Sequence, residues 1–278
     1  MNLKHDPSHV FELVNVTKVF GADGHKTQAV QEVCLGASPG ELVLLLGPSG
    51  SGKTTLLTLI AGLMKPTSGS VIIFGKNVEE YSSGELQQIR AKRIGFVFQT
   101  FLLIDSLTVS ENVALVLRFA GESPADARRR ARRLLRQFGI EHLAQKFPDT
   151  LSQGEKQRAA VARALANEPA LVIADEPTAS LESKQGFDVI QTLLAYAKQK
   201  RRCVVVASHD LRIVQFADRV LRLEDGRLVH SEANVSDRPR PLVNDPMVAG
   251  ETPGKPRVTT RQESCRSSTP QCPLASIR

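Results

Sequence analysis

The stretch Gly47-Pro48-Ser49-Gly50-Ser51-Gly52-Lys53-Thr54 decides the fold of this chain. It has the spacing G-x-x-x-x-G-K-[ST], which is typical of a loop that holds the phosphates of a nucleotide. An apolar run at residues 42–46 predicts a buried strand before the loop, and residues 55–61 predict a helix after it. The glycines let the loop turn its N–H groups inward, and the helix start adds further free N–H groups. This context favours phosphate binding over a glycine-rich turn that binds nothing.

Two side chains of the loop have their own predicted roles. Lys53 can reach the β- and γ-phosphates as a point charge, and the Thr54 hydroxyl can ligate Mg²⁺. The predicted nucleotide-binding residues are Gly47, Pro48, Ser49, Gly50, Ser51, Gly52, Lys53, Thr54 and Thr55.

Two carboxylates follow an apolar strand pattern at residues 171–174. The first, Asp175, can hold Mg²⁺ through water, and the second, Glu176, can polarise an attacking water near the γ-phosphate. The alternative is a core strand that leaves into an acidic turn.

A second helix start lies at Leu151-Ser152-Gln153-Gly154-Glu155, ahead of an alanine-rich run at residues 159–166. Ser152 stands at the N-cap position. A serine, a glycine and free N–H groups at one helix start can make a second phosphate site. The alternative is an ordinary capped helix.

These motifs resemble those of the ATPase subunits of ABC transporters, over residues 10–230. The signature of that family, LSGGQ, occurs here as Leu151 to Glu155, with Gln153 in place of the first glycine. Gln99, after a strand pattern at residues 94–98, is similar to the Q-loop glutamine. His209, after residues 204–207, is similar to the switch histidine. Residues 179–182 lie at the D-loop.

The resemblance implies ATP and Mg²⁺ as cofactors and assigns roles to particular residues. Glu176, His209 and Gln99 would be catalytic, with Glu176 as the general base. Thr54, Gln99 and Asp175 would hold Mg²⁺. Residues around 98–113 and 174–178 resemble the lipoprotein-release and macrolide-export ATPases most closely.

The resemblance also implies partners. Two copies would form a homodimer in which the phosphate loop of one copy faces Ser152, Gln153, Gly154 and Glu155 of the other. A separate integral-membrane permease would carry the cargo, with this chain peripheral on the cytoplasmic face of the cell membrane. The implied function is ATP hydrolysis that powers export or lipoprotein release. The alternatives are an ATPase that regulates a cell-wall enzyme through a membrane partner, and a soluble ABC protein that acts on ribosomes or DNA.

Three positions depart from the family pattern. Glu182 replaces the D-loop aspartate, and Gln153 adds a side chain where the family has glycine. Phe20 is the candidate for the aromatic residue that stacks on adenine, where tyrosine is common. A phenyl ring keeps the stacking surface. The alternative for Phe20 is a core residue at a strand end.

The net charge of the 278 residues is +7, and its densest source is the run Arg128-Arg129-Arg130-Ala131-Arg132-Arg133. Ser123 and Pro124 predict a helix start, and apolar residues at helical spacing then leave the arginines on another face. The run is therefore interpreted as the solvated face of an amphipathic helix, and no nucleic-acid partner is expected. A nucleic-acid patch and an attraction to anionic lipid are the alternatives. No run reaches the roughly 18 to 20 apolar residues of a membrane span.

The predicted fold is α/β, a P-loop NTPase of the ABC ATPase type, with a parallel-sheet core, an antiparallel β subdomain and a helical insertion. Three segments are predicted: an N-terminal tail at 1–9, the ATPase domain at 10–230 with its helical insertion at about 100–168, and a disordered tail at 231–278. Strands of the β subdomain are expected at 11–16, 31–35 and 71–74, and a hairpin at Asp225-Gly226. Cys34 and Cys203 are expected in the core, and Cys265 and Cys272 in the tail.

Overall fold

The computed structural model of the protein describes residues 8–21, 25–179, 181–199 and 201–233. Most of the predicted N-terminal tail and residues 234–278 of the predicted C-terminal tail lie outside this part, as do Cys265 and Cys272.

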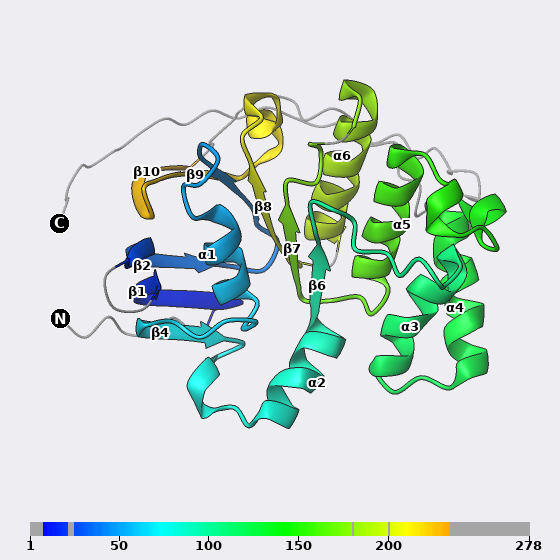
Figure 1. Ribbon diagram of the computed structural model, residues 1–278, viewed down its shortest axis with the longest axis horizontal. Helices are drawn as coiled ribbons and strands as arrows, with labels where there is room; N and C mark the ends of the chain where they lie inside the picture. Colours follow the sequence, from blue (N-terminus) through cyan, green and yellow to red (C-terminus); the bar gives the residue numbers. More distant parts are fainter. Residues whose placement is uncertain (1–7, 22–24, 180, 200, 234–278) are drawn as a thin grey trace, which may run out of the picture. The chain divides into compact units, whose positions relative to one another are not determined.

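The central sheet has six strands in the order β10-β9-β3-β8-β7-β6, and every neighbouring pair is parallel except β10 with β9. Figure 1 shows β8, β7 and β6 side by side at its centre. Every residue of β3, β7 and β8 is buried, which explains why they are continuous apolar runs rather than alternating patterns. The bounds are β3 Leu42–Leu46, β6 Ile94–Val97, β7 Leu171–Asp175, β8 Cys203–Ser208, β9 Arg219–Glu224 and β10 Arg227–Ala233.

Alternate residues of these strands face two different cores. Leu45 and Val205 pack with α1 (Lys53–Ile60) and with the second sheet, whereas Leu44 and Val204 pack against α6 (Ser183–Gln199). The alternation follows from the two-residue period of a strand. Burying a leucine or valine side chain contributes about 1.5–3 kcal/mol. The phosphate loop therefore starts from a strand that is packed on both faces.

The predicted hairpin is confirmed at Asp225 and Gly226, whose φ angles of 44° and 77° suit the tight turn between β9 and β10. Its second strand is longer than predicted. Residues 231–233, which were expected in the tail, pair in register with β9 up to Ala233. The expected start of the tail at residue 231 is therefore wrong, because the strand continues as long as β9 supplies partners.

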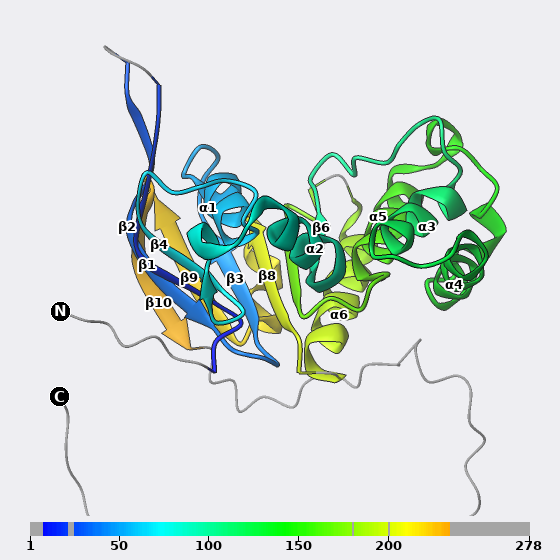
Figure 2. The same ribbon diagram turned by 90° about the horizontal axis from the view of Figure 1, so that it is seen from below.

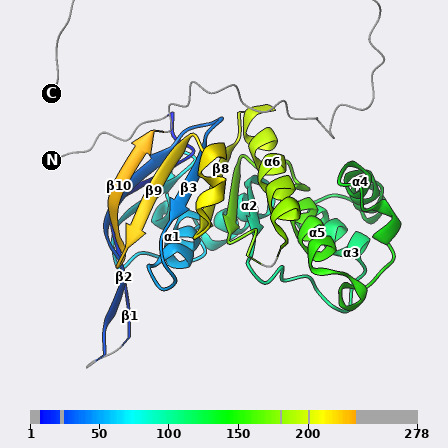
Figure 3. The same ribbon diagram turned by 90° about the horizontal axis from the view of Figure 1, so that it is seen from above.

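The second sheet is antiparallel, in the order β2-β1-β4-β5, as predicted for the β subdomain. Its strands are longer than the sequence indicated, and β1 and β2 form a hairpin arm that projects from the sheets in Figure 3. Cys203 is buried as expected, but Cys34 is exposed, and its thiol donates to Asn15 Oδ1 at 3.0 Å. The expectation of a core Cys34 is wrong because its side chain is on the outer face of β2. The bounds are β1 Phe11–Phe20, β2 Thr27–Ala37, β4 Ser68–Ile73 and β5 Lys76–Asn77.

Three helices lie within the residues expected to be mainly helical: α3 Val109–Phe119, α4 Pro124–Gln137 and α5 Gln153–Leu165. They share a third apolar core and are grouped beyond β6 in Figure 2. A further helix, α2 Ser83–Arg93, has no buried residue, so no apolar period marked it in the sequence. Short helical turns lie at η1 Val78–Glu80, η2 Glu141–Leu143, η3 Pro148–Thr150 and η4 Leu211–Phe216. Within the described ranges, none of the helices combines the length and the hydropathy of a membrane span.

Candidate active site

The phosphate loop is braced by the antiparallel sheet. Gly52 has a φ of 100° and caps α1, and a Cβ on it would lie 2.1 Å from the carbonyl oxygen of Ala29 in β2. A side chain at Gly52 is therefore excluded both by backbone conformation and by the close approach of β2. Ala29 could not be predicted as a neighbour of the loop, because a small strand residue far from the loop in the chain has no motif of its own.

Lys53 lies inside the loop rather than on its rim. Its ammonium donates to the carbonyl oxygens of Gly47 and Pro48, at 2.8 and 2.9 Å. The same nitrogen is 3.6 Å from Glu176 Oε1. The cation is thus held at the junction of the loop and the end of β7.

Asp175 and Thr54 form the part of the site that suits a cation. The Thr54 hydroxyl donates to Asp175 Oδ2 at 2.7 Å, which joins the start of α1 to the end of β7. Asp175 Oδ1 is buried and has no hydrogen-bond partner among the described residues. Burial raises the pKa of Asp175, with the Glu176 charge adding to the effect, while the Thr54 hydrogen bond and Lys53 oppose it. A carboxylate and a hydroxyl are hard oxygen ligands, so these two residues fit Mg²⁺.

Glu176 is held by contacts on both sides. His209 Nδ1 lies 2.9 Å from Glu176 Oε2, opposite the contact of Glu176 with Lys53. The Glu176 backbone has a φ of 48°, an uncommon conformation for a residue other than glycine, and its N–H donates to the Ala207 carbonyl oxygen. Such conformations concentrate at functional sites. Here the residue directly follows β7, and its carboxylate contacts Lys53 of the phosphate loop.

A cleft of about 560 Å³ collects most of the predicted residues. Gln99 lines it, although the structure gives its side chain no hydrogen bond within the described residues. Gly47 and Ser51 belong to the loop but do not line the cleft, since Ser51 is only 3% exposed. The lining residues are Ala29, Pro48, Ser49, Gly50, Gly52, Lys53, Thr54, Thr55, Gln99, Asp175, Glu176 and His209.

Phe20 lies at the end of β1 and does not line the cleft. Its side chain is 40% exposed, so the alternative of a core residue is wrong. The Lys18 ammonium lies over the ring, 5.4 Å from its centre. An exposed ring on the hairpin arm is available to stack on a planar base.

The signature residues stand apart from the cleft of the same chain. Ser152 and Glu155 form a capping box at the start of α5, in which each side chain binds the other's backbone N–H. Gln153 is exposed. Gly154 is buried, and a Cβ on it would lie 2.2 Å from Gln185 Oε1 of α6. The end of the Gln185 side chain therefore packs directly on Gly154, and a side chain at this position would displace it, a contact between α5 and α6 that the sequence did not reveal.

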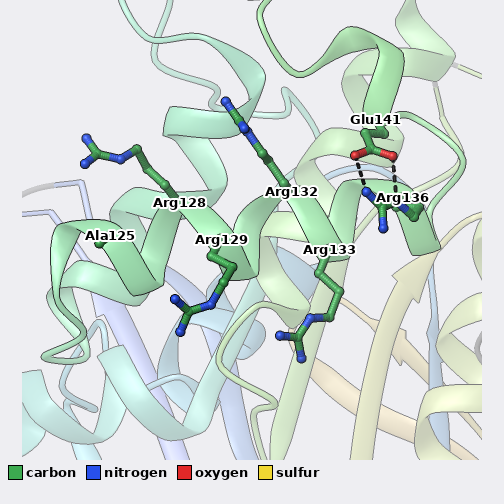
Figure 4. A pocket seen from close by; sticks show the side chains of 7 residues that line it. All are labelled: Ala125, Arg128, Arg129, Arg132, Arg133, Arg136 and Glu141. Carbon is green, nitrogen blue, oxygen red and sulfur yellow. Dashed lines mark hydrogen bonds and ion pairs between the residues drawn. The ribbon is translucent and has the colours of Figure 1, made fainter.

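The arginine run forms the outer face of α4, as predicted. Ala127, Ala131 and Leu135 are fully buried. The arginines that line an open depression of about 550 Å³ on the other face are Arg128, Arg129, Arg132, Arg133 and Arg136. Figure 4 shows them extending from the helix, with Arg136 turned to the Glu141 carboxylate, which it binds through two nitrogens at 2.7 Å. None of these arginines lines the cleft at the phosphate loop.

A comparison with protein families places most of the site within a family match. The family model described as ABC transporter matches residues 30–179, which is more than half of the chain.

Individual relatives extend the similarity to most of the chain. It is 38% identical over 217 residues to HrtA of Staphylococcus haemolyticus, named as a hemin import ATP-binding protein, covering 78% of this chain and 98% of that protein. Among solved structures, the ATP-binding cassette MJ0796 of Methanocaldococcus jannaschii is similar with a TM-score of 0.76 and 40% identity, covering 80% of this chain and 98% of that one. That structure is described as a dimer in a post-hydrolysis state, bound to ADP and Pi. CbiO1 of Clostridium perfringens, described as part of the transporter complex cbiONQ, has a TM-score of 0.71 and 28% identity, covering 81% and 89%.

Proposed function

The chain belongs to the ABC transporter family as an ATP-binding subunit with ATPase activity, and from this premise we propose that it powers a separate membrane permease. The observation that carries the catalytic part is the position of Glu176. Its carboxylate lies between Lys53 and His209, beside the pair of Asp175 and Thr54.

In this proposal each residue of the cleft has one task. Lys53 and the loop N–H groups bind the β- and γ-phosphates, and Glu176 accepts the proton of the attacking water. His209 orients the Glu176 carboxylate and approaches the γ-phosphate. Thr54, Asp175 and Gln99 would hold Mg²⁺, which neutralises charge on the phosphates when bound. Phe20 stacks on the adenine.

We further propose that the working unit is a homodimer. Ser152 and Gln153 do not line the chain's own cleft, so a second copy is needed to bring a signature segment to the phosphates. The dimeric state described for MJ0796 supports this arrangement. Each site would then combine the phosphate loop of one copy with Ser152, Gln153, Gly154 and Glu155 of the other.

The segment after Gln99 is our candidate for the contact with the permease. Leu102 and Ile104 are 54% and 42% exposed, close along the chain to a residue of the nucleotide cleft. Exposed apolar side chains of this kind mark interaction sites when they lie together. The subunit would accordingly sit on the cytoplasmic face of the membrane. The motifs resemble those of export and lipoprotein-release ATPases, so we propose this direction of transport. The relative HrtA, in contrast, is named as an import protein.

The experiment is isolation of the tagged protein from membranes of its own organism. A membrane-spanning protein should copurify with the wild type and be lost from Ile104→Asp, while ATP binding is retained. Phe119→Asp is the matched control, because Phe119 is also an exposed apolar residue, at 63%, on another element. Copurification that is equally strong in Ile104→Asp would contradict the proposed contact.

The regulator of a cell-wall enzyme shares this chemistry and would also copurify with a membrane protein. It is distinguished by reconstitution of the pair in vesicles, in which ATP-driven movement of cargo supports transport. Recovery of ribosomes or DNA in place of a membrane protein would favour the soluble alternative.

A further inference from the structure

Arg163, on the helix that Ser152 caps, reaches across to the segment that follows Gln99. Its guanidinium donates to the carbonyl oxygen of Phe101 at 2.6 Å and, through its other terminal nitrogen, to the carbonyl oxygen of Leu102. One rigid fork thus binds two successive peptide groups. The contact joins residues that are 62 positions apart in the chain.

The two carbonyls belong to a strained turn. Phe101 and Leu102 have φ angles of 61° and 47°, so two successive residues with side chains adopt the left-handed conformation. This conformation is unfavourable for residues other than glycine and persists only when surrounding contacts impose it. The turn is tight, since the Leu102 N–H donates to the Thr100 carbonyl oxygen at 2.6 Å. Gln99 immediately precedes it.

The guanidinium has no other electrostatic partner in the described part of the chain. No carboxylate there lies within ion-pair distance of Arg163, and burial lowers its pKa. Arg130 provides a contrast, because it contacts both Glu122 and Glu168. The partly buried guanidinium of Arg163 therefore relies on the carbonyl groups of Phe101 and Leu102. It is well satisfied only when the turn adopts the conformation in which both carbonyl oxygens point at it.

The far end of the segment is fixed separately. Asn112 of α3 accepts from the Ile104 N–H at 2.7 Å and donates to the carbonyl oxygens of Ile104 and Leu107. Arg163 and Asn112 therefore hold the segment at two points, and the residues held there, Leu102 and Ile104, are the ones whose side chains are exposed.

We propose that Arg163 is a positioning residue, which holds the turn at Phe101 and Leu102 and thereby links the placement of Gln99 to the position of α5. This rests on the proposed roles of Gln99 in the cleft and of Ser152 towards the partner's nucleotide. Because hydrogen bonds weaken steeply with distance and angle, a displacement of α5 cannot leave the turn unchanged. A movement of the signature segment at the start of α5 would thus shift Gln99 of the same chain.

A double-mutant cycle between Arg163 and Gln99 tests the link. Arg163→Lys keeps the charge but not the fork. We expect its ATP turnover number to fall about tenfold, with the dissociation constant for a fluorescent ATP analogue changed less than twofold. Gln99→Ala should also lower turnover, and the double variant should be no slower than Gln99→Ala alone. Arg130→Lys is the matched control and should leave turnover unchanged.

A rescue variant separates positioning from a general loss of structure. Glycine adopts the left-handed conformation without penalty, so Leu102→Gly should restore at least half of the turnover lost in Arg163→Lys. This arm is measured on the isolated protein, where the permease plays no part. Melting curves of the variants show whether each is folded.

These measurements distinguish a failure of the Arg163 link from a failure of the proposed function. Multiplicative losses in the double variant, wild-type turnover in Arg163→Lys, or no rescue by Leu102→Gly would overturn the link and leave the proposed catalysis intact. Wild-type turnover in Gln99→Ala would overturn both this proposal and the role proposed for Gln99.

Discussion

The Lys53 ammonium and the Glu176 carboxylate form a buried ion pair, with 3.6 Å between Nζ and Oε1 and side chains only 7% and 10% exposed. The pair joins the phosphate loop to the end of β7. It follows that a substitution at either residue changes the surroundings of the other, and that nucleotide affinity and turnover must be measured separately in each variant.

Replacing Glu176 with glutamine should slow ATP hydrolysis without weakening ATP binding. The amide can keep the contact with His209 but cannot accept a proton, and loss of a general base costs about 10²–10⁴-fold in rate. Lys53 keeps its charge for the phosphates. Phosphate release measures the rate, and size exclusion in ATP should show a stable dimer. Glu79→Gln, at an exposed site away from the cleft, is the control; turnover of Glu176→Gln at the wild-type rate would remove Glu176 as the base.

Replacing Asp175 with asparagine should have opposite effects on stability and activity. The pKa of Asp175 is raised by burial, so the folded protein disfavours the charged form relative to the unfolded chain. This penalty is present at neutral pH and is lost as the pH falls and the carboxyl becomes protonated. In the absence of divalent ions, Asp175→Asn should therefore melt higher than the wild type at pH 7, by a margin that narrows towards acid. Mg²⁺-dependent hydrolysis should be abolished.

A lower melting temperature for Asp175→Asn at pH 7 would contradict this account of Asp175. Adding Mg²⁺ to the nucleotide should stabilise the wild type further, whereas the variant should gain only the stability that the nucleotide provides by itself.

Replacing Phe20 with alanine should weaken the binding of ATP but leave the binding of its phosphate groups unchanged. Stacking of a base on an aromatic ring contributes about 1–3 kcal/mol, so affinity should fall roughly 5- to 150-fold. Binding of inorganic tripolyphosphate should stay the same, because it has no base. Phe147→Ala, also exposed, is the control. Equal loss of affinity for ATP and tripolyphosphate would show that Phe20 supports the loop instead of stacking.

Mixing two inactive variants should restore hydrolysis if sites form between copies. Ser152→Arg blocks the signature but leaves the loop of its own chain able to bind ATP, and Lys53→Ala removes the loop's cation but leaves the signature intact. A mixed dimer has one site in which the phosphate loop and the facing signature are both unmodified. Turnover should rise with the proportion of mixed dimers. No recovery at any ratio would count against this arrangement.

The strands that carry the site were predictable because burial on both faces leaves continuous apolar runs, as in β3, β7 and β8. The motif residues of the cleft were predictable because phosphate chemistry restricts them to a short stretch. In contrast, α2 buries no residue and so has no apolar period. The conformation of the segment after Gln99 could not be predicted either, since the contact of Arg163 with Phe101 joins residues that are 62 positions apart in the chain.

Contacts made by small or exposed residues escaped prediction for a related reason. Gly154 resembles a glycine of the signature, but its close approach to Gln185 depends on where α6 packs. Cys34 stands in an apolar strand pattern, but its face of β2 is exposed. Neither outcome can be predicted before the elements are placed in three dimensions.

The strand order of the central sheet sets the order in which the chain can fold as it is synthesised. Residues 11–77 contain every strand of the antiparallel sheet, so that sheet can form early. β3, by contrast, pairs with β8 and β9, which are made more than 150 residues later. Until Cys203–Ser208 leaves the ribosome, the edges of β3 and β7 that β8 will join are unpaired apolar strands, which invite aggregation. The nascent chain therefore exposes these edges until nearly all of its described length has been made.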